Sequence, residues 1–160
     1  MYPKYQKRNT SAFTAASYFA LAAGIFLYCI GIYNADWELN VKGYYLLCMF
    51  LIIITCIVTQ KVVRDNNEDK ELRLDNPKHR MRNTIAFTGM AFAGLVIGFA
   101  MFFIGLFNAD FDLNVKGYYI AVMLLIAYSS IGVQKVTRDN AEDKEILENL
   151  NQSNNSHYNG

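Results

Sequence analysis

Charge is scarce in this chain and absent from its longest apolar stretches. Asp, Glu, Lys and Arg make up 18% of the 160 residues, while apolar residues make up 53%. This charged share is low for a soluble domain. The charges gather in short polar blocks between long uncharged runs, a pattern typical of a membrane protein. The net charge is only +1, so the sequence gives no reason to expect nucleic acid as a partner.

The chemistry of a catalytic centre is also missing. His79 and His157 are the only histidines, and both lie in polar segments away from any cysteine. The sequence has no GxSxG motif, no phosphate loop and no metal-ligand spacing. No charged residue interrupts an apolar run, where it would mark an ion pathway. We therefore expect a protein that is not an enzyme and that holds no metal or cofactor.

What the chain does have is an internal repeat. Three polar signatures, RNT, NAD with LNVKGYY, and QKV with RDN, begin at Arg8, Asn34 and Gln60 and return at Arg82, Asn108 and Gln134. Each pair is separated by 74 positions, and residues 8–71 align on residues 82–145 without a gap at about half identity. The chain is therefore a tandem duplication.

The three cysteines lie in apolar runs of the first copy only. Cys29 and Cys48 fall near the same predicted membrane face, so one alternative is a disulfide between them. The other interpretation is that Cys29, Cys48 and Cys56 are small packing residues. The repeat favours packing, because the second copy has Phe103, Val122 and Ser130 at the matching positions.

Four uncharged runs are long enough to cross a membrane. The run from Ser11 to Tyr33 would form a helix of roughly 35 Å, and residues 85–107 repeat it. The run from Gly43 to Thr59 is shorter, about 26 Å, and residues 117–133 repeat it. A signal peptide is the alternative for the first run, but the same segment recurs in the middle of the chain. We therefore expect a structural span.

Lysine and arginine predict the orientation of these spans. The two short NAD loops carry one each, Lys42 and Lys116, while the termini and the linker between the copies carry thirteen. By the positive-inside rule, both termini lie in the cytoplasm and the NAD loops face outward. Trp37 and the tyrosines and phenylalanines that flank the two loops would then form an interfacial aromatic belt.

The predicted fold is an all-α integral membrane protein of four transmembrane helices, arranged as two tandem parallel two-helix repeats. Because both copies enter the membrane in the same sense, their symmetry axis would run along the membrane normal. We expect a cytoplasmic arm (residues 1–10), a first repeat (11–71), a cytoplasmic linker (72–84), a second repeat (85–145) and a disordered cytoplasmic tail (146–160).

Small residues form a stripe on the first span of each copy. The stripe contains Gly24 and Gly31 in the first copy and Gly98 and Gly105 in the second. Such a stripe allows two helix backbones to approach closely. The favoured interpretation is packing of the first span on the third, and the alternative is a contact between two copies of the protein.

The outward loops are candidate binding sites for a lipid headgroup or a membrane protein partner. Their candidate residues are Asn34, Asp36, Asn40, Lys42, Tyr44 and Tyr45, with the copies Asn108, Asp110, Asn114, Lys116, Tyr118 and Tyr119. Capping explains part of this pattern, because Asn34 can end one span and Asn40 can cap the next. Asp36 and Lys42 can also pair at the membrane edge.

The inward signature places Lys61 and Asp65, and likewise Arg64 and Glu68, four residues apart on a helix. It comprises Gln60, Lys61, Arg64 and Asp65, with the copies Gln134, Lys135, Arg138 and Asp139. Its basic residues also suit anionic headgroups, but its mixed charge favours a solvated helix face.

The complete pattern resembles the YiaA/YiaB two-helix family of bacterial inner membrane proteins. Two spans, an outward loop with N-A-D, L-N and K-G-Y-Y, and then Q-K-x-x-R-D carry the resemblance over residues 10–140. It implies a location in the bacterial inner membrane and a four-span tandem form, and it implies no particular activity. We expect a structural or accessory membrane protein that binds lipid or protein through its outer loops. The alternative is a small transporter or channel.

Overall fold

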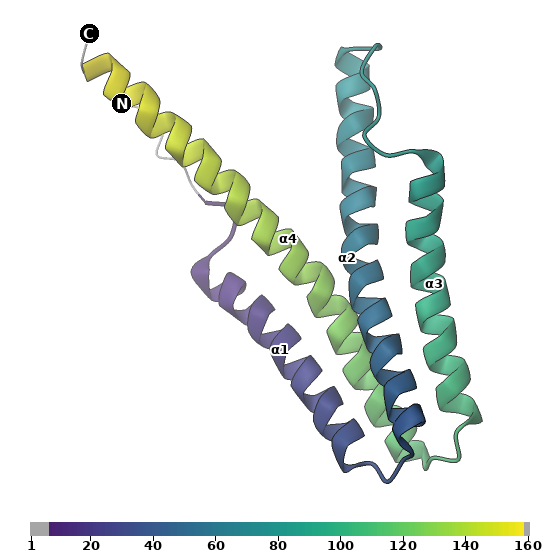
Figure 1. Ribbon diagram of the computed structural model, residues 1–160. Coiled ribbons are helices and arrows are strands. Elements are labelled where there is room, and N and C mark those ends of the chain that lie inside the picture. The colour runs from purple at the N-terminus through teal and green to yellow at the C-terminus, as the bar shows by residue number, and fades with distance from the viewer. Residues whose placement is uncertain (1–6, 159–160) are drawn as a thin grey trace.

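A computed structural model describes residues 7–158, with side chains as far as Gln152, and its regular structure there is all α-helix (Figure 1). The helices are α1 (Ser11–Asn34), α2 (Leu39–Asp75), α3 (Ile85–Asn108) and α4 (Leu113–Tyr158). All four are long and apolar enough to cross a membrane. The predicted all-α architecture with four spans is therefore confirmed.

The repeated RNT signature starts α1 and α3 in the same way. The side chain of Thr10 accepts a hydrogen bond from the backbone N–H of Phe13 at 3.2 Å, and Thr84 accepts one from Phe87 at 3.2 Å. This cap satisfies a backbone donor that the first helical turn leaves free. Each helix then runs for 24 residues, or about 36 Å, which is enough to cross the hydrocarbon core of a bilayer.

The helices pair across the repeats, not within them. α1 packs along α4 and α3 packs along α2, whereas α1 and α2 make few contacts. We call the end formed by residues 35–38 and 109–112 the loop end, and the opposite end the charged end. Figure 1 shows the two helix pairs together at the loop end and diverging toward the charged end. Contacts between α2 and α4 hold the pairs together.

The glycine stripes mediate this cross-repeat packing. A Cβ atom at Gly24 of α1 would lie 2.9 Å from Cγ1 of Ile126 on α4. At the equivalent position, a Cβ at Gly98 of α3 would lie 3.1 Å from Cγ1 of Ile52 on α2. The stripes therefore allow close approach within one chain, as expected. The expected partner was wrong, because each stripe faces the second helix of the other repeat, and α1 does not pack on α3.

Equivalent residues of the two repeats also build the core. Its fully buried members include Tyr28 and Phe102, Met49 and Met123, and Ile52 and Ile126. Cys48 and Cys56 are buried and Cys29 is exposed, and all three are free thiols. The packing interpretation of Cys48 and Cys56 thus holds, and the Cys29–Cys48 disulfide does not form in this structure.

Two predicted boundaries were wrong at the charged end. α2 continues to Asp75, inside the segment expected to be a linker, and α4 continues through residues 146–158, which were expected to be disordered. Each extension contains two leucines, Leu72 with Leu74 and Leu147 with Leu150, and leucine favours helix. In the second, Lys144 and Glu148 also form an ion pair four residues apart at 3.8 Å. Residues 1–6 of the expected arm and 159–160 of the expected tail lie outside the described residues.

Candidate functional site

Aromatic rings from equivalent positions meet at the loop end. Trp37 stacks on Phe111 with ring centroids 4.5 Å apart and planes 9° apart. Tyr45 stacks on Tyr119 at 6.2 Å, and these two tyrosines are only 1% and 2% exposed. For Tyr45 and Tyr119 the expected place in an interfacial belt is wrong, because they form the part of the core where the two repeats join. Tyr33, which is 83% exposed, does lie on the outer surface.

The neighbouring tyrosines tie the repeats together through the backbone. The Tyr44 hydroxyl on α2 donates to the carbonyl of Met101 on α3 at 2.5 Å. The Tyr118 hydroxyl on α4 donates to the carbonyl of Leu27 on α1 at 2.7 Å. Each tyrosine lies against the last glycine of a stripe, Gly105 or Gly31. This pairing gives Tyr44 and Tyr118 a structural role.

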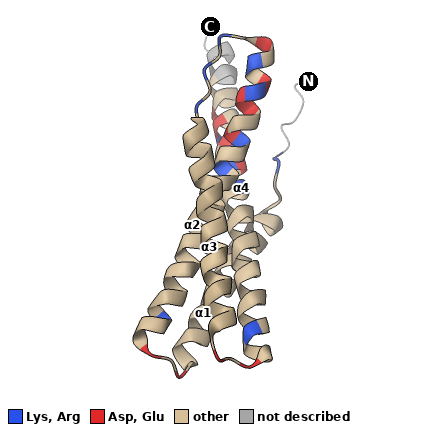
Figure 2. Ribbon diagram, turned by 90° about the vertical axis from the view of Figure 1, so that its right-hand side faces the viewer, with Lys and Arg blue, Asp and Glu red and all other residues tan. Residues whose placement is uncertain are grey.

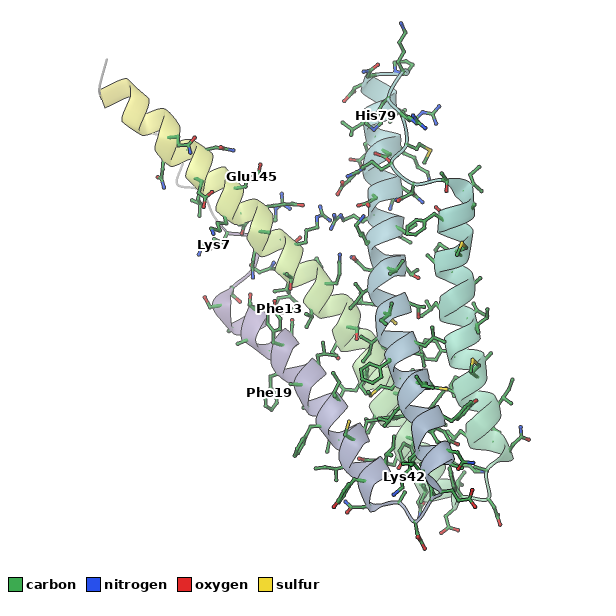
Figure 3. All side chains as sticks on the ribbon, viewed as in Figure 1. Lys7, Phe13, Phe19, Lys42, His79 and Glu145 are labelled. Carbon is green, nitrogen blue, oxygen red and sulfur yellow. The ribbon has the colours of Figure 1, made fainter. Side chains whose placement is uncertain are left out.

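The loop lysines contact the ends of the preceding helices. Lys42 Nζ donates to the carbonyl of Tyr33 at 3.3 Å, and Lys116 Nζ donates to that of Phe107 at 3.4 Å. A cation is favourable there because the last carbonyls of a helix are unsatisfied and carry partial negative charge. The expected pairing of Lys42 with Asp36 is therefore wrong. Figure 3 shows Lys42 at the loop end.

The loop asparagines occupy helix ends, but not all as expected. Asn34 and Asn108 are the last residues of α1 and α3. Asn40 is the second residue of α2, and its side-chain oxygen accepts a hydrogen bond from the N–H of Val41 at 2.8 Å. The expected capping role of Asn40 is wrong, because Glu38 precedes the helix as its N-cap.

Two grooves at the loop end have matching walls, each drawn from both repeats. The larger, about 530 Å³, is lined by Asn34, Asp110, Asp112, Asn114, Tyr118 and Tyr119, among others. The smaller, about 380 Å³, is lined by Asn40, Tyr44, Tyr45, Gly105 and Asn108, among others. Nine of the twelve loop residues predicted from the sequence therefore line a groove, and Asp36, Lys42 and Lys116 are the three that line neither.

The rim of the loop end is acidic. The side chains of Asp36, Glu38, Asp110 and Asp112 are all exposed there, and Figure 2 shows red segments at this end of the molecule. Lys42 and Lys116, the two lysines nearby, both contact backbone carbonyls. The exposed carboxylates therefore give this surface a negative potential that attracts cations and repels anions.

The charged end carries an ion-pair network that links α2 to α4. Lys61 pairs with Asp65 at 2.6 Å and Arg64 with Glu68 at 2.9 Å, which confirms the predicted spacing. Arg138 of α4 pairs with Glu142 on its own helix, and it also pairs with Glu68 of α2 at 2.8 Å. The second repeat differs: the ion pairs of the described residues do not join Lys135 to Asp139, and Asp139 instead accepts a hydrogen bond from Asn9 Nδ2 at 3.2 Å.

Sequence reasoning missed a buried carboxylate at this end. The fully buried Asp69 accepts hydrogen bonds from the backbone N–H of Arg82 at 2.7 Å, from His79 at 3.1 Å and from Arg82 Nε at 2.9 Å. These donors, the Arg82 backbone foremost, lower the pKa of Asp69 to about 2. In the second repeat, Asp143 accepts from the N–H of Arg8 at 2.9 Å. Asp69 with Arg82 and Asp143 with Arg8 are pairs of residues from the repeated signatures. Their repetition in the sequence is the feature that could have indicated these contacts.

The two repeats, which have equivalent geometry, each match the same family of proteins. The yiaA/B two helix domain matches this chain twice, over residues 13–65 and 87–139. The chain belongs to this family. The matched segments contain both glycine stripes and all of the groove residues. Asp69 and Asp143 lie just beyond the matched segments, so these two buried carboxylates fall outside the yiaA/B domain itself.

Two relatives illustrate the family's range. The chain is 51% identical to the "uncharacterized membrane protein YubF" of Bacillus subtilis over 83 residues, which is 51% of this chain and 95% of YubF. It is 32% identical to the "inner membrane protein YiaA" of Escherichia coli over 128 residues, 80% of this chain and 81% of YiaA. YubF is thus about one repeat long. No solved structure matches the chain.

Two glutamines of the matched segments have buried side-chain oxygens toward the charged end. The side-chain oxygens of Gln60 and Gln134 are buried, and among the described residues neither has a hydrogen-bond partner. The same holds for Nη1 of Arg64. Buried polar atoms are rarely left without a partner, because their desolvation is costly. These atoms therefore mark the charged end as a second candidate site.

Proposed function

We propose that this protein is a non-catalytic accessory protein of the bacterial inner membrane, whose loop end binds a basic segment of another envelope protein. The proposal places the charged end in the cytoplasm and the loop end outside. The thirteen lysines and arginines outside the NAD loops support this orientation. The inner membrane location is supported by the similarity to YiaA.

One observation carries the choice of partner. Four exposed carboxylates lie at the loop end, two of them, Asp110 and Asp112, in the wall of the larger groove, and the nearby lysines contact helix-end carbonyls. A lipid phosphate at this surface would be repelled by the carboxylates, whereas a lysine- or arginine-containing segment would be attracted. The grooves offer Asn and Tyr side chains to orient such a segment. The partner of the loop end is therefore better described as protein than as lipid.

The experiment places a photo-crosslinking amino acid at Leu113, an exposed position beside the larger groove. In native membranes we expect one reproducible protein adduct, which weakens as salt rises because the contact is electrostatic. The combined variant Asp36→Asn, Glu38→Gln, Asp110→Asn and Asp112→Asn should lose the adduct.

The matched control neutralises exposed acids at the other end, Glu71→Gln with Glu145→Gln, and should keep the adduct. Adducts with lipid alone, or a protein adduct that survives in the four-acid variant, would contradict the proposal. Substrate-dependent flux through liposomes that contain the protein would favour the transporter alternative instead.

A further inference from the structure

A cavity at the charged end changes from mostly apolar to mostly polar along α2. It has a volume of about 410 Å³ and lies between α2, α3 and α4. Cys56, Leu95 and Ile131 line its deeper part, and Gln60, Arg64 and Asn67 follow toward the charged end. A phospholipid has the same order, with acyl chain toward the bilayer centre and headgroup toward water.

Two side chains that line this cavity each carry a buried polar atom that has no hydrogen-bond partner among the described residues. Nη1 of Arg64 is a buried donor, and Oε1 of Gln60 is a buried acceptor. The rest of the Arg64 guanidinium is occupied by Glu68 at 2.9 Å and Asp65 at 3.5 Å. A ligand that satisfied both atoms would present an acceptor to Arg64 and a donor to Gln60.

The cavity borders the surface that faces lipid. Val63 and Ile131, two of its lining residues, are each 40% exposed. In a bilayer these side chains meet hydrocarbon, so a molecule can enter sideways from the membrane. The occupant is therefore expected to be a lipid of the leaflet at the charged end.

The local charge selects among headgroups. Among the described residues, the ion-pair network around Arg64 contains equal numbers of lysine or arginine cations and carboxylate anions, namely Arg8, Lys61, Arg64, Arg82 and Arg138 against Asp65, Glu68, Asp69, Glu142 and Asp143. A headgroup without net charge leaves this balance intact. It must also carry an N–H or O–H donor for Gln60, which a choline headgroup lacks.

We propose that this cavity binds phosphatidylethanolamine. The side chains of Arg64 and Gln60 rotate toward the cavity, so that a phosphate oxygen accepts a hydrogen bond from Arg64 Nη1 and the ammonium group donates one to Gln60 Oε1. The first part of an acyl chain lies against Leu95 and Ile131. The two polar contacts are charge-assisted hydrogen bonds in a site shielded from water, where such bonds are strong.

Native mass spectrometry of the full chain tests this site. The detergent-purified protein is mixed with equal amounts of phosphatidylethanolamine and phosphatidylcholine that carry the same acyl chains. We expect the ethanolamine lipid to dominate the bound population by about tenfold, the effect of one hydrogen bond to a charged group. A second mixture replaces the choline lipid with phosphatidylglycerol, which has donors but also net negative charge, and the ethanolamine lipid should again dominate.

Gln60→Met and Arg64→Lys should each abolish the preference, because each removes one of the two atoms that the lipid satisfies. Lys70→Met is the matched control, since Lys70 is an exposed lysine of the same helix that neither lines the cavity nor belongs to the ion-pair network named above; it should keep the preference. Equal binding of the choline lipid, preferential binding of phosphatidylglycerol, or an unchanged preference in Gln60→Met would overturn the proposal.

Discussion

Gly105 shows how closely the helices of this bundle approach one another. A Cβ atom at Gly105 would lie 2.6 Å from Cε1 of Tyr44, which is closer than real Cβ contacts allow. The same tyrosine ring positions the hydroxyl that donates to the Met101 carbonyl. Any side chain at Gly105 must therefore displace Tyr44 and weaken the bond that holds α2 to α3.

We predict that Gly105→Ala destabilises the protein by about 1–3 kcal/mol, the usual effect of overpacking. Gly89→Ala is the control, because a Cβ at Gly89 would meet nothing within 4 Å. That substitution should be neutral or slightly stabilising, since alanine favours helix. Thermal unfolding in detergent measures both. Equal melting temperatures for the two variants would show that Tyr44 does not fix the approach of the helices.

Asp69 should make stability depend on acid pH. In the folded protein its pKa is about 2, mainly because the Arg82 backbone N–H donates to it, against an ordinary value of 3.8. A lowered pKa stabilises the fold above the ordinary value, and this stabilisation is lost as pH falls from 3.8 toward 2. Unfolding of wild-type protein in detergent should therefore become easier over this interval. Asp69→Asn should flatten that part of the pH profile. An unchanged profile would show that the hydrogen bonds of Asp69 to Arg82 and His79 do not contribute to the stability of the fold.

At the scale of helices, the sequence predicted the elements better than their partners. The uncharged runs located all four spans, because burial in hydrocarbon requires a nearly uncharged segment of a fixed minimum length. The glycine stripes located the closely packed face. They could not identify the opposing helix, because any smooth apolar helix fits such a face. The assumption that Gly24 packs on the third span failed for this reason.

Crosslinking can separate the observed pairing from two independent hairpins. Asn140 Nδ2 lies 3.5 Å from Thr14 Oγ1, which joins α4 to α1, and Asn66 meets Thr88 in the same way at 3.1 Å. In a cysteine-free background, Thr14→Cys with Asn140→Cys should crosslink readily. Thr14→Cys with Asn66→Cys, both in the first repeat, should not.

The repeat itself suggests the cysteine-free background, namely Cys29→Phe, Cys48→Val and Cys56→Ser, which are the residues of the second copy. Crosslinking is measured as a mobility shift after mild oxidation. Efficient crosslinking of the pair within the first repeat would show that each repeat folds as its own hairpin.

The candidate sites were predicted unevenly for a related reason. The repeated loop signature correctly indicated a special region, and most of its residues line the grooves. Their individual roles depended on the partner helix, which the sequence does not reveal. Tyr45 was expected at the interface and lies in the core because its ring meets Tyr119 of the other repeat. The acidic rim, by contrast, follows directly from the four carboxylates in the loop sequences.

At the scale of the whole molecule, orientation is the main testable property. In the cysteine-free background, Ala35→Cys and Ala109→Cys should react with a membrane-impermeant thiol reagent added outside the cell, since both lie at the loop end. Asn149→Cys, on the charged extension of α4, should react only after the membrane is permeabilised. The reverse labelling pattern would invert the proposed topology and place the acidic grooves in the cytoplasm.

The pairing of α1 with α4 has a consequence for how the protein is made. Gly24 and its partner Ile126 are about a hundred residues apart, so a ribosome that adds about 5–20 residues per second needs about 5–20 s to supply the partner. α2 and α3 are neighbours in the chain and can associate while α4 is still being synthesised. Until then, the glycine face of α1 has only lipid or insertion machinery beside it. Biogenesis therefore ends with the last span closing over the first, and a chain truncated before α4 would present an unfinished surface to membrane quality control.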